Sequence, residues 1–337
     1  MTKTKTSRKQ AWRRNKIEAD RSARENKQQL HTENRIDASE LGPQQSGRII
    51  CHFGANFSVQ DSHGNHHLCL SRRNLPKLVC GDHVTWQSTG EQEGVIVALQ
   101  PRHSLLARPG YHKQLKPIAA NIDQILVVIA PRPSIDEDLI NRYLVAATLT
   151  AITPVIVLNK VDLLGAKEMA NIQQRLQVYE QLGYEVIHAS THQQQGLKEL
   201  LNKLENKTSI FVGQSGVGKS SLIKTILPDS SVRIGELSHA SGLGKHTTTV
   251  STLYQLPHNG AIIDSPGIRE FGLGQFDAAQ IAQGFVEFQT LTLQCKFNDC
   301  SHHAEPGCAV RQAVETGVVQ KSRYDSFLRI VNAAHRH

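Results

Sequence analysis

Residues 213–220 read Gly-Gln-Ser-Gly-Val-Gly-Lys-Ser and satisfy the P-loop pattern G-x-x-x-x-G-K-[ST] in full. The apolar run at 208–212 predicts a short buried strand before the loop, and residues 220–227 predict a helix that opens at it. Strand, glycine loop and helix in this order form a phosphate site, because the glycines let backbone N–H groups close around the phosphate oxygens and the helix N-terminus adds partial positive charge. Lys219 is expected to reach the β and γ phosphates, and Ser220 to bind Mg²⁺. The flanking strand and helix disfavour the alternative, a glycine-rich turn with an incidental lysine.

A second motif, Asp264-Ser-Pro-Gly267, follows the apolar run at 261–263. Asp264 is therefore expected at the end of a buried strand, where the aspartate of a D-x-x-G switch motif meets the magnesium shell. Asp-Ser-Pro-Gly is also good turn chemistry, so a plain turn is the alternative. The motif lies 44 residues after Ser220 and behind a strand, which favours the switch.

A third motif, Asn159-Lys160-Val161-Asp162, ends the apolar run at 154–158. Its carboxylate can accept hydrogen bonds from two N–H donors of guanine, whereas adenine has no matching pair. GTP is therefore the predicted nucleotide, and a helix-capping loop is the alternative interpretation. Ala189-Ser190, after a strand-like run at 185–188, matches the remaining base-contacting loop weakly.

Strand and helix patterns alternate through Asp264, starting with a buried strand at 121–130 and a helix at 135–149. This spacing predicts a mainly parallel α/β sheet with helices on both faces. Ser220 and Asp264 are the predicted Mg²⁺ ligands. The predicted GTP-binding residues are Asn159, Lys160, Val161, Asp162, Ala189, Ser190, Gly213, Gln214, Ser215, Gly216, Val217, Gly218, Lys219, Ser220, Ser221, Asp264 and Gly267.

Positive charge is concentrated at the N-terminus of the chain. Residues 1–35 hold eleven Lys and Arg against four Asp and Glu, so this segment carries +7 of the formal net charge of +8. With few apolar residues it cannot pack a core, and it is expected to be disordered when free and to contact nucleic acid. A membrane surface is disfavoured because no apolar face accompanies the charge. The polar N-terminus and the lack of an 18-residue apolar run predict a cytoplasmic protein.

Short β-like runs fill residues 47–107 and predict a small five-stranded barrel. Three single cysteines are expected in the core: Cys51, Cys69 and Cys80. Residues 101–116, with two prolines and many basic residues, predict a linker into the sheet domain. Candidates for a nucleic-acid platform, whose aromatic members are equally candidates for the core, are Phe53, Phe57, Arg72, Arg73 and Trp86.

Three thiols and one imidazole lie within fourteen residues near the C-terminus, at Cys295, Cys300, His302 and Cys308. They form a complete tetrahedral ligand set for structural zinc, and His303 is a rival imidazole. Disulfides would require an oxidising compartment, which contradicts the missing signal peptide. A closed site has no open position for a substrate, so the zinc is expected to hold together a small module that follows a helical stretch after Phe276.

The motif order, with the guanine motif before the P-loop, resembles that of the circularly permuted GTPases. The segment Gly244-Lys-His-Thr-Thr-Thr249 and the cysteine cluster make the chain similar to one family among them, the bacterial GTPases that depend on the small ribosomal subunit. The resemblance runs from about Ser46 onward. The predicted protein is multidomain: a disordered basic arm at 1–45, an OB-fold RNA-binding barrel at 46–108, a permuted α/β GTPase domain at 115–276 and a mainly helical zinc module at 277–337.

The resemblance also implies the function, which is GTP hydrolysis on the small ribosomal subunit and its rRNA during late subunit maturation. The family pattern Cys-x-His-x-x-Glu-Pro-x-Cys selects His302 as the zinc ligand. Ile268 stands where Ras-like proteins carry a water-orienting glutamine, so intrinsic hydrolysis is expected to be slow unless another group enters. His246 matches a histidine proposed for that role in the family and is, with Lys219, the predicted catalytic residue.

One residue of the run Thr247, Thr248 and Thr249 is expected to bind Mg²⁺ and sense the γ-phosphate. A monomer is expected. Two other functions stay open: an RNA-binding assembly chaperone in which GTP is mainly a conformational lock, and a signalling or membrane-trafficking GTPase. The absence of lipidation signals disfavours the second of these.

Overall fold

The computed structural model describes residues 41–109, 115–227, 251–264 and 273–334. The chain divides into two compact units, one made of residues up to 78 together with 83–101, the other made of 79–82 together with 102 onward. Most of the predicted basic arm lies outside the described residues. The same is true of the predicted switch residues His246, Thr247, Thr248, Thr249 and Gly267.

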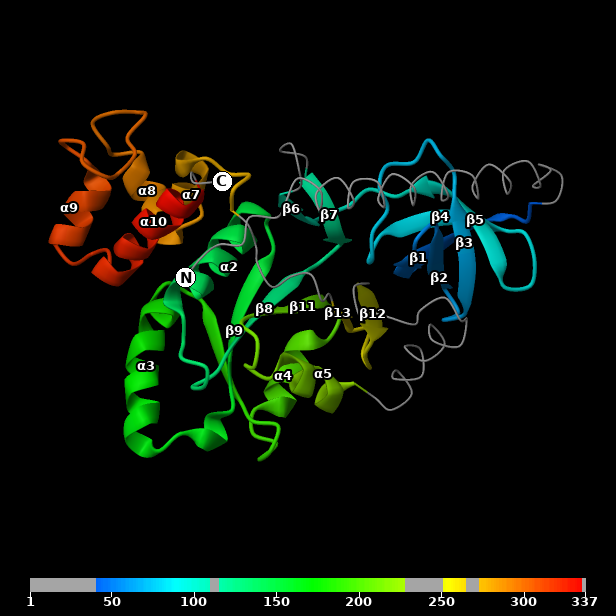
Figure 1. The fold of residues 1–337 in the computed structure, drawn as a ribbon, viewed down its shortest axis with the longest axis horizontal. Helices are drawn as coiled ribbons and strands as arrows, with labels where there is room; N and C mark the ends of the chain where they lie inside the picture. The colour runs from blue at the N-terminus through cyan, green and yellow to red at the C-terminus, as the bar shows by residue number, and fades with distance from the viewer. Residues whose placement is uncertain (1–40, 110–114, 228–250, 265–272, 335–337) are drawn as a thin grey trace, which may run out of the picture. The chain divides into compact units, whose positions relative to one another are not determined.

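The first unit is a closed barrel with the strand order β1-β2-β3-β5-β4 (Figure 1). β3 and β5 run parallel, and the other neighbouring strands are antiparallel. The predicted five-stranded barrel is confirmed, and its architecture is OB-like. Its strands are β1 (Gln44–Phe53), β2 (Asn56–Asp61), β3 (His66–Ser71), β4 (His83–Ser88) and β5 (Glu93–Leu99).

Two aromatic residues that were candidates for a nucleic-acid platform lie inside the barrel. Trp86 is 1% exposed and Phe57 is 8% exposed, and both belong to the barrel core with Ile49 and Ile96. A Cβ on Gly94 would lie 2.6 Å from the indole ring, so the barrel needs glycine there to admit the tryptophan. These two side chains therefore stabilise the barrel and cannot offer a face to a nucleic acid.

The remaining platform candidates are at the surface: Phe53 is half-buried, and Arg72 and Arg73 are exposed. The single cysteines are buried, as expected for small core residues: Cys51, Cys69 and Cys80. Among the described helices, none has the length and apolar character that a membrane span requires.

The linker prediction for residues 101–116 is wrong in part. Strands β6 (Leu105–Pro109) and β7 (Leu115–Ala120) form a two-stranded antiparallel sheet. Leu106 and Ala119 are buried there, which gives these strands an apolar anchor that a linker would lack. The ladder shifts register between Leu106 and Ala107, where Pro117 is the partner, and such an irregularity accommodates a residue without an N–H group.

The second unit contains a six-stranded sheet in the order β10-β9-β8-β11-β13-β12. All neighbouring strands are parallel except β12, which pairs antiparallel with β13. The mainly parallel α/β sheet is therefore confirmed. Its strands are β8 (Gln124–Ile129), β9 (Thr153–Asn159), β10 (Glu185–Ala189), β11 (Thr208–Val212), β12 (Thr252–Gln255) and β13 (Ala261–Asp264).

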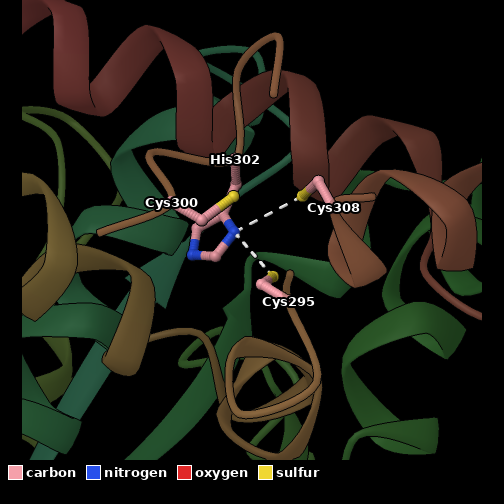
Figure 2. A group of neighbouring side chains, drawn as sticks. All are labelled: Cys295, Cys300, His302 and Cys308. Carbon is pink, nitrogen blue, oxygen red and sulfur yellow. Dashed lines mark hydrogen bonds between the residues drawn. The ribbon is translucent and has the colours of Figure 1, made fainter. Parts of the chain in front are cut away.

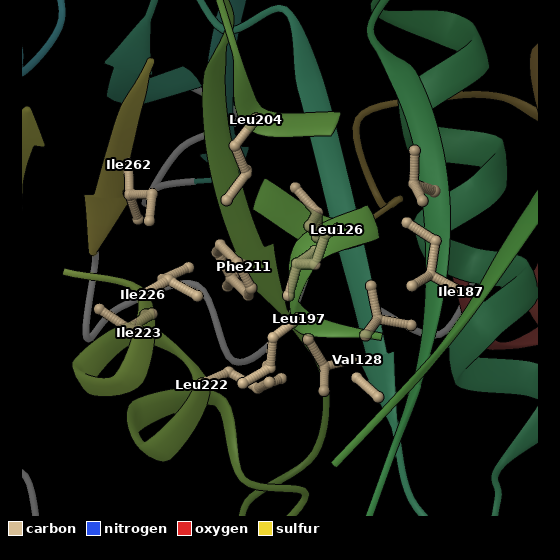
Figure 3. Close-up of a cluster of buried hydrophobic side chains, with 14 of the residues drawn as sticks. Leu126, Val128, Ile187, Leu197, Leu204, Phe211, Leu222, Ile223, Ile226 and Ile262 are labelled. Carbon is tan, nitrogen blue, oxygen red and sulfur yellow. The ribbon is translucent and has the colours of Figure 1, made fainter. Parts of the chain in front are cut away.

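Helices cover both faces of this sheet, as predicted. α4 (Leu197–Leu204) and α5 (Lys219–Ile226) pack against Leu126 and Val128 of β8 on one face (Figure 3). α2 (Glu137–Leu149) meets Val127 and Ile129, which point to the other face because side chains alternate along a strand. Arg175 joins α3 (Ala166–Gln181) to the first turn of α2.

The C-terminal part is mainly helical, as expected. Its core holds three stacked or edge-on rings, Phe285, Phe288 and Phe327, with centroids 5.0 to 5.6 Å apart. Val145 and Ala146 of α2 belong to the same core, so this zinc module, as we call residues 277–334, packs directly on the sheet domain. Its helices are α7 (Ala278–Gln283), η4 (Val286–Phe288), α8 (Gln289–Thr292), α9 (Ala309–Glu315) and α10 (Lys321–Ala334).

Candidate functional site

The P-loop joins β11 to α5 through a backbone that requires glycine. Gly213, Gly216 and Gly218 have φ angles of 136°, 85° and 95°. A Cβ on Gly213 would lie 2.2 Å from the Val128 carbonyl oxygen, and one on Gly218 would lie 2.4 Å from Nδ2 of Asn159. Only glycine fits at these two positions, so the spacing of the motif follows from the shape of the loop.

The Lys219 ammonium folds back over the loop that precedes it. Its Nζ donates to the carbonyl oxygens of Gly213 at 2.7 Å and Gln214 at 2.6 Å. A bound phosphate would offer stronger, charged acceptors in place of these neutral carbonyls. Ser220 and Ser221 lie in the first turn of α5, where the helix N-terminus favours negative charge.

The predicted guanine motif is hydrogen-bonded to the P-loop. Asn159 Nδ2 donates to the Val217 carbonyl oxygen at 2.9 Å, and Lys160 Nζ donates to the Gly216 carbonyl oxygen at 2.6 Å. Lys160 has a left-handed backbone, with φ 62°, at the start of η3 (Val161–Leu163). The Asn159 Oδ1 atom is buried with no hydrogen-bond partner among the described residues, as expected of an atom that awaits a ligand. Two motifs more than fifty positions apart thus meet in one site.

Asp162 is held by the loop after β10. Ser190 Oγ donates to Asp162 Oδ1 at 2.5 Å and accepts from the Gln193 backbone N–H at 3.1 Å. The Ser190 N–H donates to the Gln195 carbonyl oxygen at 3.0 Å, which closes the loop. A carboxylate has about four lone-pair sites, so the serine bond leaves acceptors for two N–H donors of a base. The weak Ala189-Ser190 match is therefore placed beside Asp162, although the glutamines that shape it carry no motif signal.

Asp264 ends β13, next to β11 in the sheet, so both the P-loop and this carboxylate lie at the carboxyl edge of parallel strands. Desolvation raises the pKa of the Asp264 carboxyl although part of the side chain is exposed, and the charge of Lys219 opposes that rise. Oxygen ligands from a P-loop hydroxyl and a strand-end carboxylate suit Mg²⁺. Ser220 and Asp264 are the described residues that would hold it.

The four predicted zinc ligands converge in the zinc module (Figure 2). Their ligand atoms all lie within 4.8 Å of one another, and His302 Nδ1 is 3.6 Å from the Cys295 sulfur and 3.5 Å from the Cys308 sulfur. Bonds of about 2.1 to 2.3 Å at tetrahedral angles place ligand atoms roughly 3.4 to 3.8 Å apart, so the cluster fits zinc. His302 is 4% exposed inside the cluster, whereas His303 is exposed.

Glu305 and Tyr324 support this cluster from outside it. The Glu305 carboxylate accepts from Ser301 Oγ and from the backbone N–H groups of Ser301, His303 and Ala304. These hydrogen bonds lower the pKa of Glu305 to about 2, so it is ionised near neutrality. The Tyr324 hydroxyl, on α10, donates to the His302 carbonyl oxygen at 2.6 Å. No local motif marks Tyr324, which is 22 positions from the ligand it contacts.

The sheet is mainly parallel and carries a P-loop, and the guanine motif bonded to that loop comes before it along the chain. These features define a circularly permuted P-loop GTPase. The family model of the RsgA GTPases matches residues 99–274. The chain belongs to the RsgA GTPase family.

Full-length relatives agree with this placement. The chain is 51% identical to the small ribosomal subunit biogenesis GTPase RsgA of Chromohalobacter salexigens, over 98% of each chain. It is 48% identical to the protein of the same name in Hahella chejuensis, over 98% of this chain and 96% of the other.

Two solved structures share the fold. YjeQ from Thermotoga maritima matches with a TM-score of 0.73 and 29% identity, over 88% of this chain and all of the other. YloQ, described as a circularly permuted GTPase, matches with a TM-score of 0.71 and 27% identity, over 87% of this chain and 96% of the other. The circular permutation predicted from the motif order is thereby confirmed.

Proposed function

We propose that this protein binds the small ribosomal subunit late in its biogenesis, hydrolyses GTP there and then leaves. The observation that carries the nucleotide part is the direct bonding of the guanine motif to the P-loop, through Asn159 to Val217 and Lys160 to Gly216. These bonds would hold the loop that recognises the base next to the loop that binds the phosphates. The ribosomal part is supported by the names of relatives that align over nearly the full chain.

The proposed reaction is in-line attack of water on the γ-phosphate of GTP. A bond forms between the water oxygen and the γ-phosphorus as the bond to the β–γ bridging oxygen breaks, giving GDP and phosphate. Lys219 leaves the Gly213 and Gln214 carbonyls and neutralises charge on the phosphate oxygens. Bound Mg²⁺, held by Ser220 and Asp264, would supply further charge neutralisation. His246, outside the described residues, is our candidate for orienting the water.

We further propose a division of labour along the chain: residues 1–45 and the barrel at 46–108 contact rRNA, residues 115–276 bind GTP, and residues 277–337 form the zinc module. Arg72 and Arg73 are the exposed charges of the barrel that we assign to RNA contact. Zinc in the closed Cys₃His set would stabilise the module and take no part in hydrolysis. We propose a monomer that acts in the cytoplasm, where small subunits mature.

The test is GTP turnover by the full chain with and without purified small ribosomal subunits, at two salt concentrations. We expect strong stimulation that weakens at high salt, because contacts between basic residues and RNA release counterions. Turnover that small subunits leave unchanged at both salt concentrations would refute the proposed partner while leaving the GTP site intact. It would then favour the assembly chaperone, for which turnover is incidental.

A further inference from the structure

Helix α2 has one face against the nucleotide site. A small apolar cavity separates its first turns from the back of the P-loop, and its walls include Leu139, Ile140 and Tyr143 of α2 and Gly213, Gln214 and Val217 of the loop. Ile140 and Tyr143 are each 1% exposed. This end of α2 and the P-loop thus line the same cavity, so a shift of α2 would change the packing next to the loop.

The other face of α2 is part of the zinc module. Val145 and Ala146 lie in the module core, and a Cβ on Gly284 would come within 2.5 Å of the Val145 side chain. Glycine at 284 therefore allows the C-terminal end of α7 to approach α2 closely. Helix α2 therefore has two neighbours. Its first turns face the P-loop, and Val145 and Ala146, nearer its C-terminal end, pack in the zinc module.

Arg323 of α10 connects the zinc module to α2 through hydrogen bonds. Its side chain is 2% exposed, and its Nε and Nη2 donate to the two Glu287 carboxylate oxygens at 2.7 and 3.0 Å. Its Nη1 donates to Oδ1 of Asn141, which lies on α2 and is buried. The guanidinium also lies over the rings of Phe285 at 4.6 Å and Tyr179 at 5.6 Å.

A buried ion pair of this kind contributes little net stability, because desolvation of both charges offsets most of their attraction. The ion pair does fix the orientation of the Arg323 guanidinium, because a planar group with two hydrogen bonds to one carboxylate can take only one orientation. That orientation aims Nη1 at Asn141, next to Ile140 in the cavity wall. The network therefore fixes the rotation of α2 relative to the module more than it holds the two together.

We propose that Arg323 is a positioning residue that couples the zinc module to the P-loop through Asn141 of α2. A contact of the small subunit with the module, added to the RNA contacts proposed above for the arm and the barrel, would then change the rate of GTP hydrolysis. The ribosomal part of this inference rests on the proposed function. The coupling itself rests on contacts within one compact unit and can be tested without a ribosome.

The decisive variant is Asn141→Ala. It cuts the link to α2 and leaves the Arg323–Glu287 pair intact, whereas replacing Arg323 would strand a buried carboxylate and risk unfolding. Alanine also suits a helix interior. Arg329→Ala is the matched control, because Arg329 joins the same two helices through an exposed pair with Asp138, at 2.7 and 2.8 Å.

The first readout is the ratio of subunit-stimulated to basal GTP turnover. We expect Asn141→Ala to lower this ratio about tenfold, at unchanged affinity for small subunits and unchanged zinc content, while Arg329→Ala keeps it within about twofold. A purely structural role would lower both rates in proportion and leave the ratio unchanged. An unchanged ratio, or a loss explained by weaker subunit binding, would overturn the proposal.

The second readout is amide hydrogen exchange of the free, zinc-loaded protein. Coupling predicts that Asn141→Ala speeds exchange in the P-loop, residues 213–218, about fivefold or more, and that Arg329→Ala does not. Equal P-loop exchange in Asn141→Ala and the unmodified chain would overturn the coupling. If small subunits do not stimulate the unmodified chain, the proposed function fails. The exchange experiment still tests the coupling between the zinc module and the P-loop.

Discussion

Lys219 is hydrogen-bonded to the loop whose phosphate it is predicted to contact. In the structure its ammonium donates hydrogen bonds to two loop carbonyl oxygens, Gly213 and Gln214. Nucleotide binding needs only an exchange of acceptors on the same nitrogen. The loop is therefore pre-organised for phosphate, and little conformational entropy is lost on binding.

Lys219→Ala should lower GTP turnover by about 10²- to 10³-fold, because it removes a charged donor aimed at the transferring phosphate. Lys224→Ala is the matched control, since Lys224 is exposed on the same helix and should be near neutral. Steady-state hydrolysis with radiolabelled GTP measures both. Unimpaired turnover in Lys219→Ala would refute the P-loop assignment.

Asp162→Asn should exchange base specificity. Asparagine can still accept from Ser190 but presents an N–H donor where the carboxylate had an acceptor, so GTP affinity should fall by about 10²-fold or more. Xanthosine triphosphate, which has a carbonyl in place of the guanine amino group, should bind the variant better than GTP. Titration with fluorescent nucleotides tests this, with Asp325→Asn as a remote control. A variant that keeps its preference for GTP would contradict our assignment of Asp162.

The positions of residues whose chemistry requires a set spacing were the easiest to predict from the sequence. Phosphate binding demands glycines and a lysine at set spacing, and the structure places those residues around one loop. Whether Trp86 points into the barrel or out of it could not be predicted. Side chains alternate along a strand, so residues 84 and 86 share one face, but the sequence does not tell which face is inward. Closure of the barrel decides it, and closure depends on five strands at once.

The segment that carries the Cys₃His cluster is organised by a carboxylate outside the candidate ligand set. The Glu305 carboxylate accepts hydrogen bonds from three backbone N–H groups of residues 301–304, between the candidate ligands Cys300 and Cys308. Its lowered pKa, about 2 against an ordinary value of 4.5, means that this support is complete above pH 4.5. It is lost only as the pH falls from 4.5 toward 2.

Glu305→Gln should therefore loosen the segment at neutral pH, because the amide has one acceptor oxygen where the carboxylate has two and carries no charge. We expect zinc transfer to a chromogenic chelator to become several-fold faster, as is found for changes that leave metal ligands in place but remove their supports. Glu315→Gln, at an exposed position on α9, is the control. Identical transfer rates in the two variants would show that the carboxylate has no role in holding the zinc segment.

At the level of elements, the alternation of strand and helix patterns was enough to predict the sheet, whereas β6 and β7 were missed. Proline and basic residues dominate the composition of 101–116 and conceal the few apolar side chains, such as Leu106, that become buried. Whether a weakly apolar segment folds depends on the surface it can cover. That surface, which includes Cys80 paired to Ala119, lies outside the segment itself.

At the scale of the whole molecule, circular permutation keeps the sheet and changes which segment of the chain follows it. Among the described residues, β13, which ends in Asp264, is the last strand along the chain before the zinc module. No local pattern predicted the return contact from the module to α2, because Arg323 and Asn141 are 182 positions apart. Such long-range pairs arise only when both elements are folded.

In the proposed cycle, the protein binds the small subunit in its GTP-bound state. Linkage then requires that the bound subunit raise the affinity of the protein for GTP by the same factor. The most direct test is the dissociation constant for purified small subunits, measured with the protein bound to a non-hydrolysable GTP analogue and then to GDP. We predict about tenfold or more tighter binding in the GTP-like state, because only then does release follow from hydrolysis. Equal dissociation constants in the two states would contradict the proposed cycle of binding, hydrolysis and departure.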